Sequence, residues 1–223
     1  WSDDQGKTWA PSIPLGIEGL ESCSPYGRMI VTSTGTLLMT VYGPYSNQVP
    51  ALKNMQPTNG DYAYLVSSQD QGETWKIALL IMDQHNETAL LPLADGRLLA
   101  VGRSSGSMQR MDYGFSSDGG TTWSSPLRLT GKNQHPGDLL HLSNGWILLI
   151  YGDRGQSEEV IRGIISRDQG LTWDFSNEII CSRPVQGDFG YPSGLVLPNG
   201  NLAITYYWAG KARDSYDGSQ ANA

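Results

Sequence analysis

The apolar residues of this chain occur in short runs separated by polar turns that contain glycine. Four such runs each begin with a glycine that follows a polar residue, and they cover 35–42, 96–103, 145–152 and 200–207. A short apolar stretch also precedes these turns, as at 88–93 and 193–197. No segment longer than about ten residues keeps the 3.6-residue period of an amphipathic helix. The pattern therefore predicts an all-β protein made of short strands joined by turns.

A second repeat lies between these runs. The octapeptide pattern S-x-D-x-G-x-T-W begins at residues 2, 68, 116 and 166. Its aspartate can accept hydrogen bonds from its own turn, and its glycine can take a positive φ. Threonine and tryptophan favour the strand that follows. We interpret all four octapeptides as structural turns that close hairpins, and we expect each tryptophan to pack between neighbouring units.

Together the two repeats define a unit of four strands. Units of roughly 50 residues with four strands are typical of β-propeller blades. The octapeptide is identified as the Asp-box of the sialidase-like (BNR repeat) superfamily, and the chain resembles part of a six-bladed sialidase-type propeller. We expect one propeller domain over 1–223, with a partial first blade at 1–20, blades at about 21–80, 81–130 and 131–180, and a partial last blade at 181–223. A closed ring would then need strands from outside these residues or from an oligomeric partner.

Composition narrows the range of partners. The 15 Lys and Arg against 22 Asp and Glu give a formal charge of −7, and the basic residues form no cluster. This balance argues against nucleic acid or an anionic membrane as the main partner. No apolar run approaches the roughly 18 residues that a transmembrane helix needs. The two cysteines show no metal-binding or disulfide spacing, and we expect neither a metal nor another cofactor.

The blade topology brings the start of each innermost strand to one rim of the propeller. Counting nine residues back from each turn glycine reaches Tyr26, Glu87, Pro136 and Tyr191. With the ends of the adjoining strands, the expected site contains Arg28, Glu87, Arg103, Asp138, Arg154, Asp188 and Tyr191. Several arginines at one place repel each other unless an anion lies among them, and planar guanidinium groups suit a carboxylate. An acidic sugar is the natural candidate ligand.

The resemblance assigns catalytic roles to two of these residues. Sialidases use a tyrosine instead of a carboxylate as nucleophile. Segment 188–193 resembles the nucleophile segment of the family, which makes Tyr191 the nucleophile. Segment 85–88 resembles the strand that carries the family's glutamate, which makes Glu87 the base. A free phenol, with a pKa of about 10, is a poor nucleophile unless a nearby carboxylate takes its proton.

The resemblance also assigns arginines to the ligand. Arg103 and Arg154 correspond to the second and third arginines of the family's triad, with Arg162 as a less favoured third. The first arginine and the acid/base aspartate of the family precede the first Asp-box, and we expect them outside these residues. Arg28 is a candidate additional anion contact, although its surroundings differ from those of the family's first arginine.

Each candidate also has a purely structural explanation. Asp138 and Asp188 are polar contacts to the ligand or simple turn caps. Glu87 and the arginines could be solvated charges or salt bridges, and Tyr191, which precedes a proline, could be a core aromatic at a bend.

The expected function is that of an exo-α-sialidase, which releases a terminal sialic acid with retention through a tyrosyl-glycosyl intermediate. The expected partner is a sialylated or other acidic glycan. One alternative is a propeller that binds glycans without turnover. Another is a related glycosidase or lyase that acts on a different acidic sugar, such as a uronic acid. Because glycan substrates are common outside cells, an extracellular or periplasmic location is favoured.

Overall fold

The structure is a computed structural model that describes residues 2–11, 14–107, 109–155, 159–184 and 187–210. The end of the expected last blade, 211–223, lies outside these residues. The described chain folds into four sheets and two single-turn 3₁₀ helices, η1 (Pro50–Leu52) and η2 (Phe175–Asn177). The expected all-β class is confirmed, and so are the four-stranded antiparallel units.

The sheets follow one another along the chain. The first has the order β1-β5-β4-β3-β2 and contains β1 (Ile17–Glu18), β2 (Ser24–Val31), β3 (Leu37–Gly43), β4 (Tyr62–Ser68) and β5 (Trp75–Asp83). The second contains β6 (His85–Pro92), β7 (Leu98–Ser104), β8 (Met111–Ser116) and β9 (Leu127–Arg128). The third contains β10 (Gln134–His141), β11 (Ile147–Asp153), β12 (Val160–Ser166) and β13 (Ile179–Ser182). The fourth pairs β14 (Gly187–Val196) with β15 (Leu202–Gly210). Within each sheet the strands pair antiparallel, except that β1 adds to β5 in parallel.

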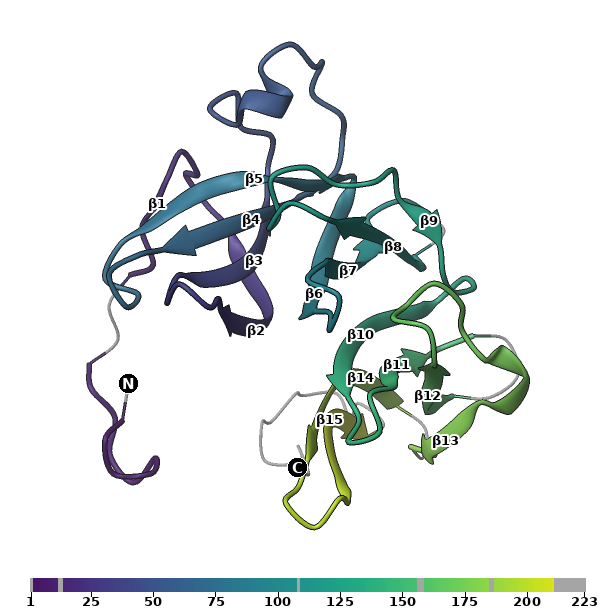
Figure 1. The fold of residues 1–223 in the computed structure, drawn as a ribbon. Coiled ribbons are helices and arrows are strands. Elements are labelled where there is room, and N and C mark those ends of the chain that lie inside the picture. The colour runs from purple at the N-terminus through teal and green to yellow at the C-terminus, as the bar shows by residue number, and fades with distance from the viewer. Residues whose placement is uncertain (1, 12–13, 108, 156–158, 185–186, 211–223) are drawn as a thin grey trace.

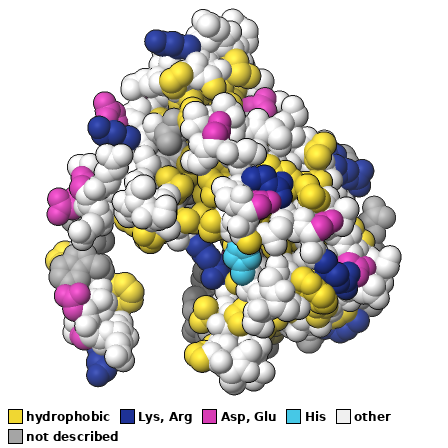
Figure 2. All heavy atoms as spheres, viewed as in Figure 1, with side chains coloured by type: hydrophobic (Ala, Val, Ile, Leu, Met, Phe, Trp, Pro, Cys, Tyr) yellow, Lys and Arg dark blue, Asp and Glu magenta, His cyan; other side chains and the backbone are white. Residues whose placement is uncertain are grey.

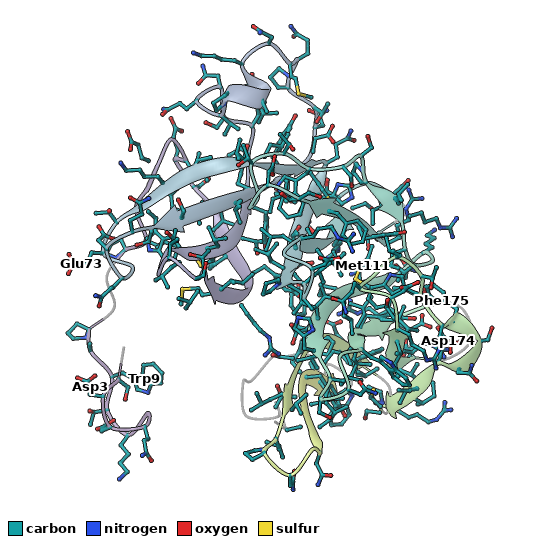
Figure 3. The ribbon with its side chains drawn as sticks, viewed as in Figure 1. Asp3, Trp9, Glu73, Met111, Asp174 and Phe175 are labelled. Atoms are coloured by element: carbon teal, nitrogen blue, oxygen red, sulfur yellow. The ribbon has the colours of Figure 1, made fainter. Side chains whose placement is uncertain are left out.

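The sheets stand side by side in an arc, with β2, β6, β10 and β14 along its inner side (Figure 1). Apolar side chains fill the spaces between successive sheets, and the two middle sheets have a neighbour on both faces. One cluster joins the first and second sheets through Leu65 and Leu98, and another joins the second and third through Leu99 and Leu149. Met111, labelled in Figure 3, lies in the latter cluster. The strands of the middle sheets therefore consist of nearly continuous apolar runs.

The Asp-boxes form the turns that the pattern predicts. In the turn between β4 and β5, Asp70 accepts hydrogen bonds from the backbone N–H of Thr74, at 2.9 Å, and from the Ser68 hydroxyl, at 2.7 Å. The backbone of Gly72 is left-handed, with φ +95°, as its role in the turn requires. Trp75 donates from its indole N–H to the carbonyl of Gly72 at 3.1 Å. The turns are thus structural, because their polar side chains are occupied by their own backbone.

The tryptophans that close the boxes pack between neighbouring sheets, as expected, in two of the four units. Trp123 packs between the first and second sheets, and Trp173 packs between the second and third. Trp75 is buried within the first sheet's own cluster, so the expectation of packing between units is wrong there. Trp9 differs, because it lies on the N-terminal segment away from the sheets and is 73% exposed (Figure 3). The space-filling view shows the same segment separated from the body of the protein (Figure 2).

The innermost strands share one irregularity at the same end. Each has a β-bulge, where its pairing with the next strand shifts register. The shifts lie between Tyr26 and Ile30 in β2, between His85 and Thr88 in β6, between Gln134 and Gly137 in β10, and between Gly190 and Ser193 in β14. Bulges bend a strand and redirect side chains, and they are common beside active sites. Four bulges at matching positions therefore create one irregular rim on an otherwise regular fold.

Candidate active site

The four bulges place the candidate side chains together. Arg28, Glu87, His135 and Tyr191 each lie within the bulge of their own strand. Tyr191 has a left-handed backbone, with φ +50°, which is uncommon for a residue other than glycine. This conformation accompanies a side chain that is 42% exposed, so Tyr191 is a surface residue of the rim and is not buried in the core.

Glu87 is the centre of a hydrogen-bonded chain. Its side chain is buried, with the residue 5% exposed, which excludes a simple solvated charge. One carboxylate oxygen accepts a hydrogen bond from the Tyr191 hydroxyl. The other accepts from Nη1 of Arg103, on the neighbouring strand β7, at 2.8 Å. Burial and the Glu87 carboxylate raise the pKa of Tyr191 above its ordinary value of 10.0, so the phenol is neutral near pH 7.

A second polar chain faces this one. Arg154, which follows β11, donates from Nη1 to the backbone carbonyl of His135 at 3.0 Å and from Nη2 to the Tyr207 hydroxyl at 3.3 Å. Tyr207 in turn donates to the carboxylate of Asp188. Nε of Arg154 lies 3.6 Å from the same carboxylate. Burial, and then the hydrogen bond to Asp188, raise the pKa of Tyr207.

Gly190 allows Arg154 to reach this position. A Cβ atom at Gly190 would lie 2.4 Å from Nη2 of Arg154, closer than any real contact of this kind. The φ of Gly190 is +147°, a conformation that side chains disfavour. Glycine at this position therefore brings the guanidinium of Arg154 against the backbone of the strand that carries Tyr191.

His135 is the third buried group of the rim. The residue is 3% exposed, and its Nδ1 has no hydrogen-bond partner. Burial, and then the charges of Arg103 and Arg154, lower the pKa of His135 from 6.5 to about 3. The imidazole is therefore neutral near pH 7. Nε of Arg103 and Nε of Arg154 are likewise buried without a hydrogen bond.

Arg28 and Asp138 form an ion pair with each other. Nη2 of Arg28 lies 2.6 Å from Oδ2 of Asp138, and Nε lies 3.3 Å from Oδ1. The carboxylate also accepts from the backbone N–H of Gly194, at 3.0 Å, and from the Ser193 hydroxyl, at 3.3 Å. The pair thus joins β2, β10 and β14. Asp138 lies within β10, not in a turn, and is buried, so it is not a turn cap.

The two hydrogen-bonded chains, one centred on Glu87 and the other on Arg154, surround a single cleft. It has a volume of about 430 Å³ and is lined by Arg103, Gln109, Asn133, His135, Arg154, Asp188, Tyr191 and Tyr207. A smaller cavity of about 190 Å³ lies on the other side of Tyr191 and includes Arg28 and Asp138. The structure therefore brings all seven expected side chains to the region of Tyr191, with Arg28 and Asp138 on a different side from the two arginines of the main cleft.

Four residues of the cleft are not among the expected site residues, namely Gln109, Asn133, His135 and Tyr207. Tyr207 ends one of the four apolar runs, and His135 stands one position before the counted residue Pro136. The repeat register is the signal that could have found His135. Arg162, the less favoured third arginine, pairs instead with Asp153 at 2.6 Å and with Glu178 at 3.0 Å.

Metal-binding clusters and membrane-spanning helices are absent from the described residues. That part of the chain contains no group of three His, Cys, Asp or Glu side chains placed to bind a metal ion. It also contains no helix long and apolar enough to cross a membrane. In the face shown in Figure 2, the basic side chains are scattered among acidic and uncharged ones.

Sheets packed face to face, Asp-boxes at their turns and a polar cleft at the ends of their inner strands define a β-propeller of the sialidase type. The chain belongs to the family of the BNR repeat-like domain, whose family model matches residues 1–204.

Known proteins support this assignment. A sialidase from Clostridium perfringens is 29% identical over 231 residues, which cover 92% of this chain and 58% of the relative. A crystal structure of a protein of unknown function from Dyadobacter fermentans is 24% identical, with a TM-score of 0.74 over 93% of this chain and 58% of that one. A Trypanosoma rangeli sialidase in complex with sialic acid is 18% identical, with a TM-score of 0.60 over 89% of this chain and 32% of that one. The chain thus spans less than two thirds of each protein.

Proposed function

We propose that this chain carries the nucleophile side of a retaining exo-α-sialidase, with Tyr191 as the nucleophile and Glu87 as its base. The observation that carries the proposal is the hydrogen bond from the Tyr191 hydroxyl to the buried carboxylate of Glu87. The phenol is neutral, so it must lose its proton as it attacks. Glu87 is already in position to take that proton.

The first step forms a bond between the Tyr191 oxygen and the anomeric carbon. As this bond forms, the phenolic proton moves to Glu87, the glycosidic C–O bond breaks, and the leaving oxygen departs with the bonding pair. The leaving oxygen takes up a proton from solvent. In the second step water attacks the anomeric carbon and gives one proton to solvent, while the phenolic oxygen leaves. Glu87 returns its proton to that oxygen, and the free sugar keeps its anomeric configuration. A neutral nucleophile suits an anionic sugar, because it does not repel the ligand's carboxylate.

Arg103 and Arg154 hold the carboxylate of the ligand in this proposal. Both line the cleft beside Tyr191, and each has a guanidinium Nε that is buried without a hydrogen bond. Two cations that face one cleft are stabilised when an anion binds between them. The Trypanosoma rangeli relative is described in complex with sialic acid, which supports the same class of ligand for this chain.

The test is release of the phenol from an aryl α-sialoside by this chain and by Tyr191→Phe. An aryl group leaves with little protonation, so the assay does not depend on the acid/base aspartate. The proposal is supported if the parent releases a sugar with retained anomeric configuration and Tyr191→Phe shows no turnover. A parent that binds the sialoside without cleaving it would favour a glycan-binding propeller. Cleavage only of aryl uronides would favour an enzyme for another acidic sugar.

A further inference from the structure

His135 has no role in the chemistry described above, yet it lines the same cleft as Arg103, Arg154 and Tyr191. The charges of both arginines act on its ring. Its backbone carbonyl is already used, because it accepts a hydrogen bond from Arg154. Its Nδ1 is buried and unpartnered, so a ligand in the cleft meets the ring at Nε2, which has no hydrogen bond among the described residues. Polar groups of native structures generally have partners, so an unpartnered atom of the cleft calls for an explanation.

The ring differs chemically from its two neighbours. Arginine side chains only donate hydrogen bonds and always carry a positive charge. The imidazole of His135 is neutral here, so one of its nitrogens donates and the other accepts, whichever tautomer is present. It therefore adds no charge with which to attract a carboxylate. A ligand group that both donates and accepts satisfies the imidazole in either tautomer, and a hydroxyl group does both.

We propose that His135 is a specificity-determining residue, whose imidazole hydrogen-bonds a hydroxyl group of the acidic sugar beside the carboxylate held by Arg103 and Arg154. This inference rests on the proposed function, because it concerns the same ligand in the same cleft. Recognition of the acidic sugar then involves two kinds of contact. The arginines select for the negative charge of the sugar, and His135 selects for the position of one hydroxyl group near that charge.

The experiment is a cycle that changes the protein and the sugar separately. The sugars are an aryl α-sialoside and a set of its monodeoxy analogues, each of which lacks one hydroxyl group. The proteins are the parent chain, His135→Phe and His135→Asn, which keeps a donor and an acceptor. His141→Phe is the matched control, because His141 is exposed, lies at the opposite end of β10 and donates from Nε2 to the Pro92 carbonyl. The value of kcat/KM is measured for every combination.

We expect His135→Phe to lower kcat/KM for the full sialoside about tenfold, with partial recovery in His135→Asn. One deoxy analogue should be about tenfold poorer than the sialoside with the parent chain, and equal to it with His135→Phe. His141→Phe should leave all these ratios unchanged. Equal losses in His135→Phe for every sugar would overturn the inference, because they would indicate a structural role.

The same cycle separates this inference from the proposed function. If the parent chain binds the sialoside without turnover, the sialidase proposal fails, and the ratios are measured as Kd by calorimetry instead of kcat/KM. A hydroxyl-specific loss of affinity in His135→Phe would then still support the role of His135. A parent chain that neither cleaves nor binds the sialoside would overturn both.

Discussion

The Tyr191 hydroxyl donates a hydrogen bond to the Glu87 carboxylate, although the two residues are 104 positions apart and lie on β14 and β6. No local sequence pattern contains both residues. They meet because each lies in the bulge of an innermost strand, at the same end of its own sheet. The pair is therefore a product of the repeat, which places equivalent positions of different blades at one rim.

Replacing Glu87 by Gln should remove the base and keep the shape of the site. Glutamine can still accept the hydrogen bond from Tyr191, but it cannot take the proton. General base catalysis commonly contributes 10²–10⁴-fold, so kcat for an aryl α-sialoside should fall by roughly this factor. KM should change by less than about threefold, because the two arginines remain. Steady-state kinetics measure both values. A Glu87→Gln variant with more than about a tenth of the parent kcat would contradict the role of Glu87.

Replacing Gly190 by Ala should displace Arg154. The added Cβ would lie 2.4 Å from Nη2 of Arg154, and φ +147° is unfavourable for alanine. We expect KM for the sialoside to rise about tenfold or more as the guanidinium shifts. Gly106→Ala is the control, because no atom lies within 4 Å of a Cβ there and φ is not positive. An unchanged KM in Gly190→Ala would show that Arg154 does not hold the carboxylate.

Breaking the ion pair of Arg28 and Asp138 should destabilise the fold. Asp138→Ala removes the carboxylate from the guanidinium of Arg28, which keeps only the Gly194 carbonyl among the described residues, and it leaves the N–H of Gly194 without its acceptor. Hydrogen bonds to charged groups contribute about 1.5–3 kcal/mol, and the partial exposure of Arg28 favours the lower end. Urea unfolding measures the loss. The double variant Arg28→Met with Asp138→Leu should be more stable than Asp138→Ala, because it leaves no unpaired charge.

The Asp-boxes should make the protein sensitive to acid. Hydrogen bonds from Thr122 and Ser116 lower the pKa of Asp118 from 3.8 to about 2, and Asp70 behaves in the same way. The folded-state pKa lies below that of the unfolded chain, so this stabilisation is fully present above pH of about 4 and is lost as the pH falls towards about 2. Thermal unfolding across this range measures the effect. Asp118→Asn should flatten the dependence, and an unchanged slope would contradict it.

Much of the fold is predictable because its signals are local. The turn glycines, the Asp-boxes and the apolar runs each determine a strand or a turn within about ten residues, and their repetition indicates the blades. The exception is Trp9, whose octapeptide matches the others but whose side chain is exposed. Trp123 and Trp173 are partly buried because they pack between two sheets, and Trp75 is buried against its own sheet.

The site is predictable only in part. Counting from the turn glycines brings Glu87 and Tyr191 to one rim, but it does not reveal which charges satisfy one another. Arg28 was expected at the ligand, whereas it pairs with Asp138 from another sheet. His135 was missed because its burial and its two cationic neighbours depend on contacts between sheets. Such contacts leave no trace in any single repeat.

The bulges of β2, β6, β10 and β14 also separate the site from the pairing that holds each sheet together. The strands pair on both sides of each bulge, so the bulge residues are free of the ladder and can serve other contacts. Arg28, Glu87 and Tyr191 use this freedom to bind partners in other strands. His135 lines the cleft without a side-chain hydrogen bond to any described residue, so a library at this one position would sample new ligand preferences with every ladder intact.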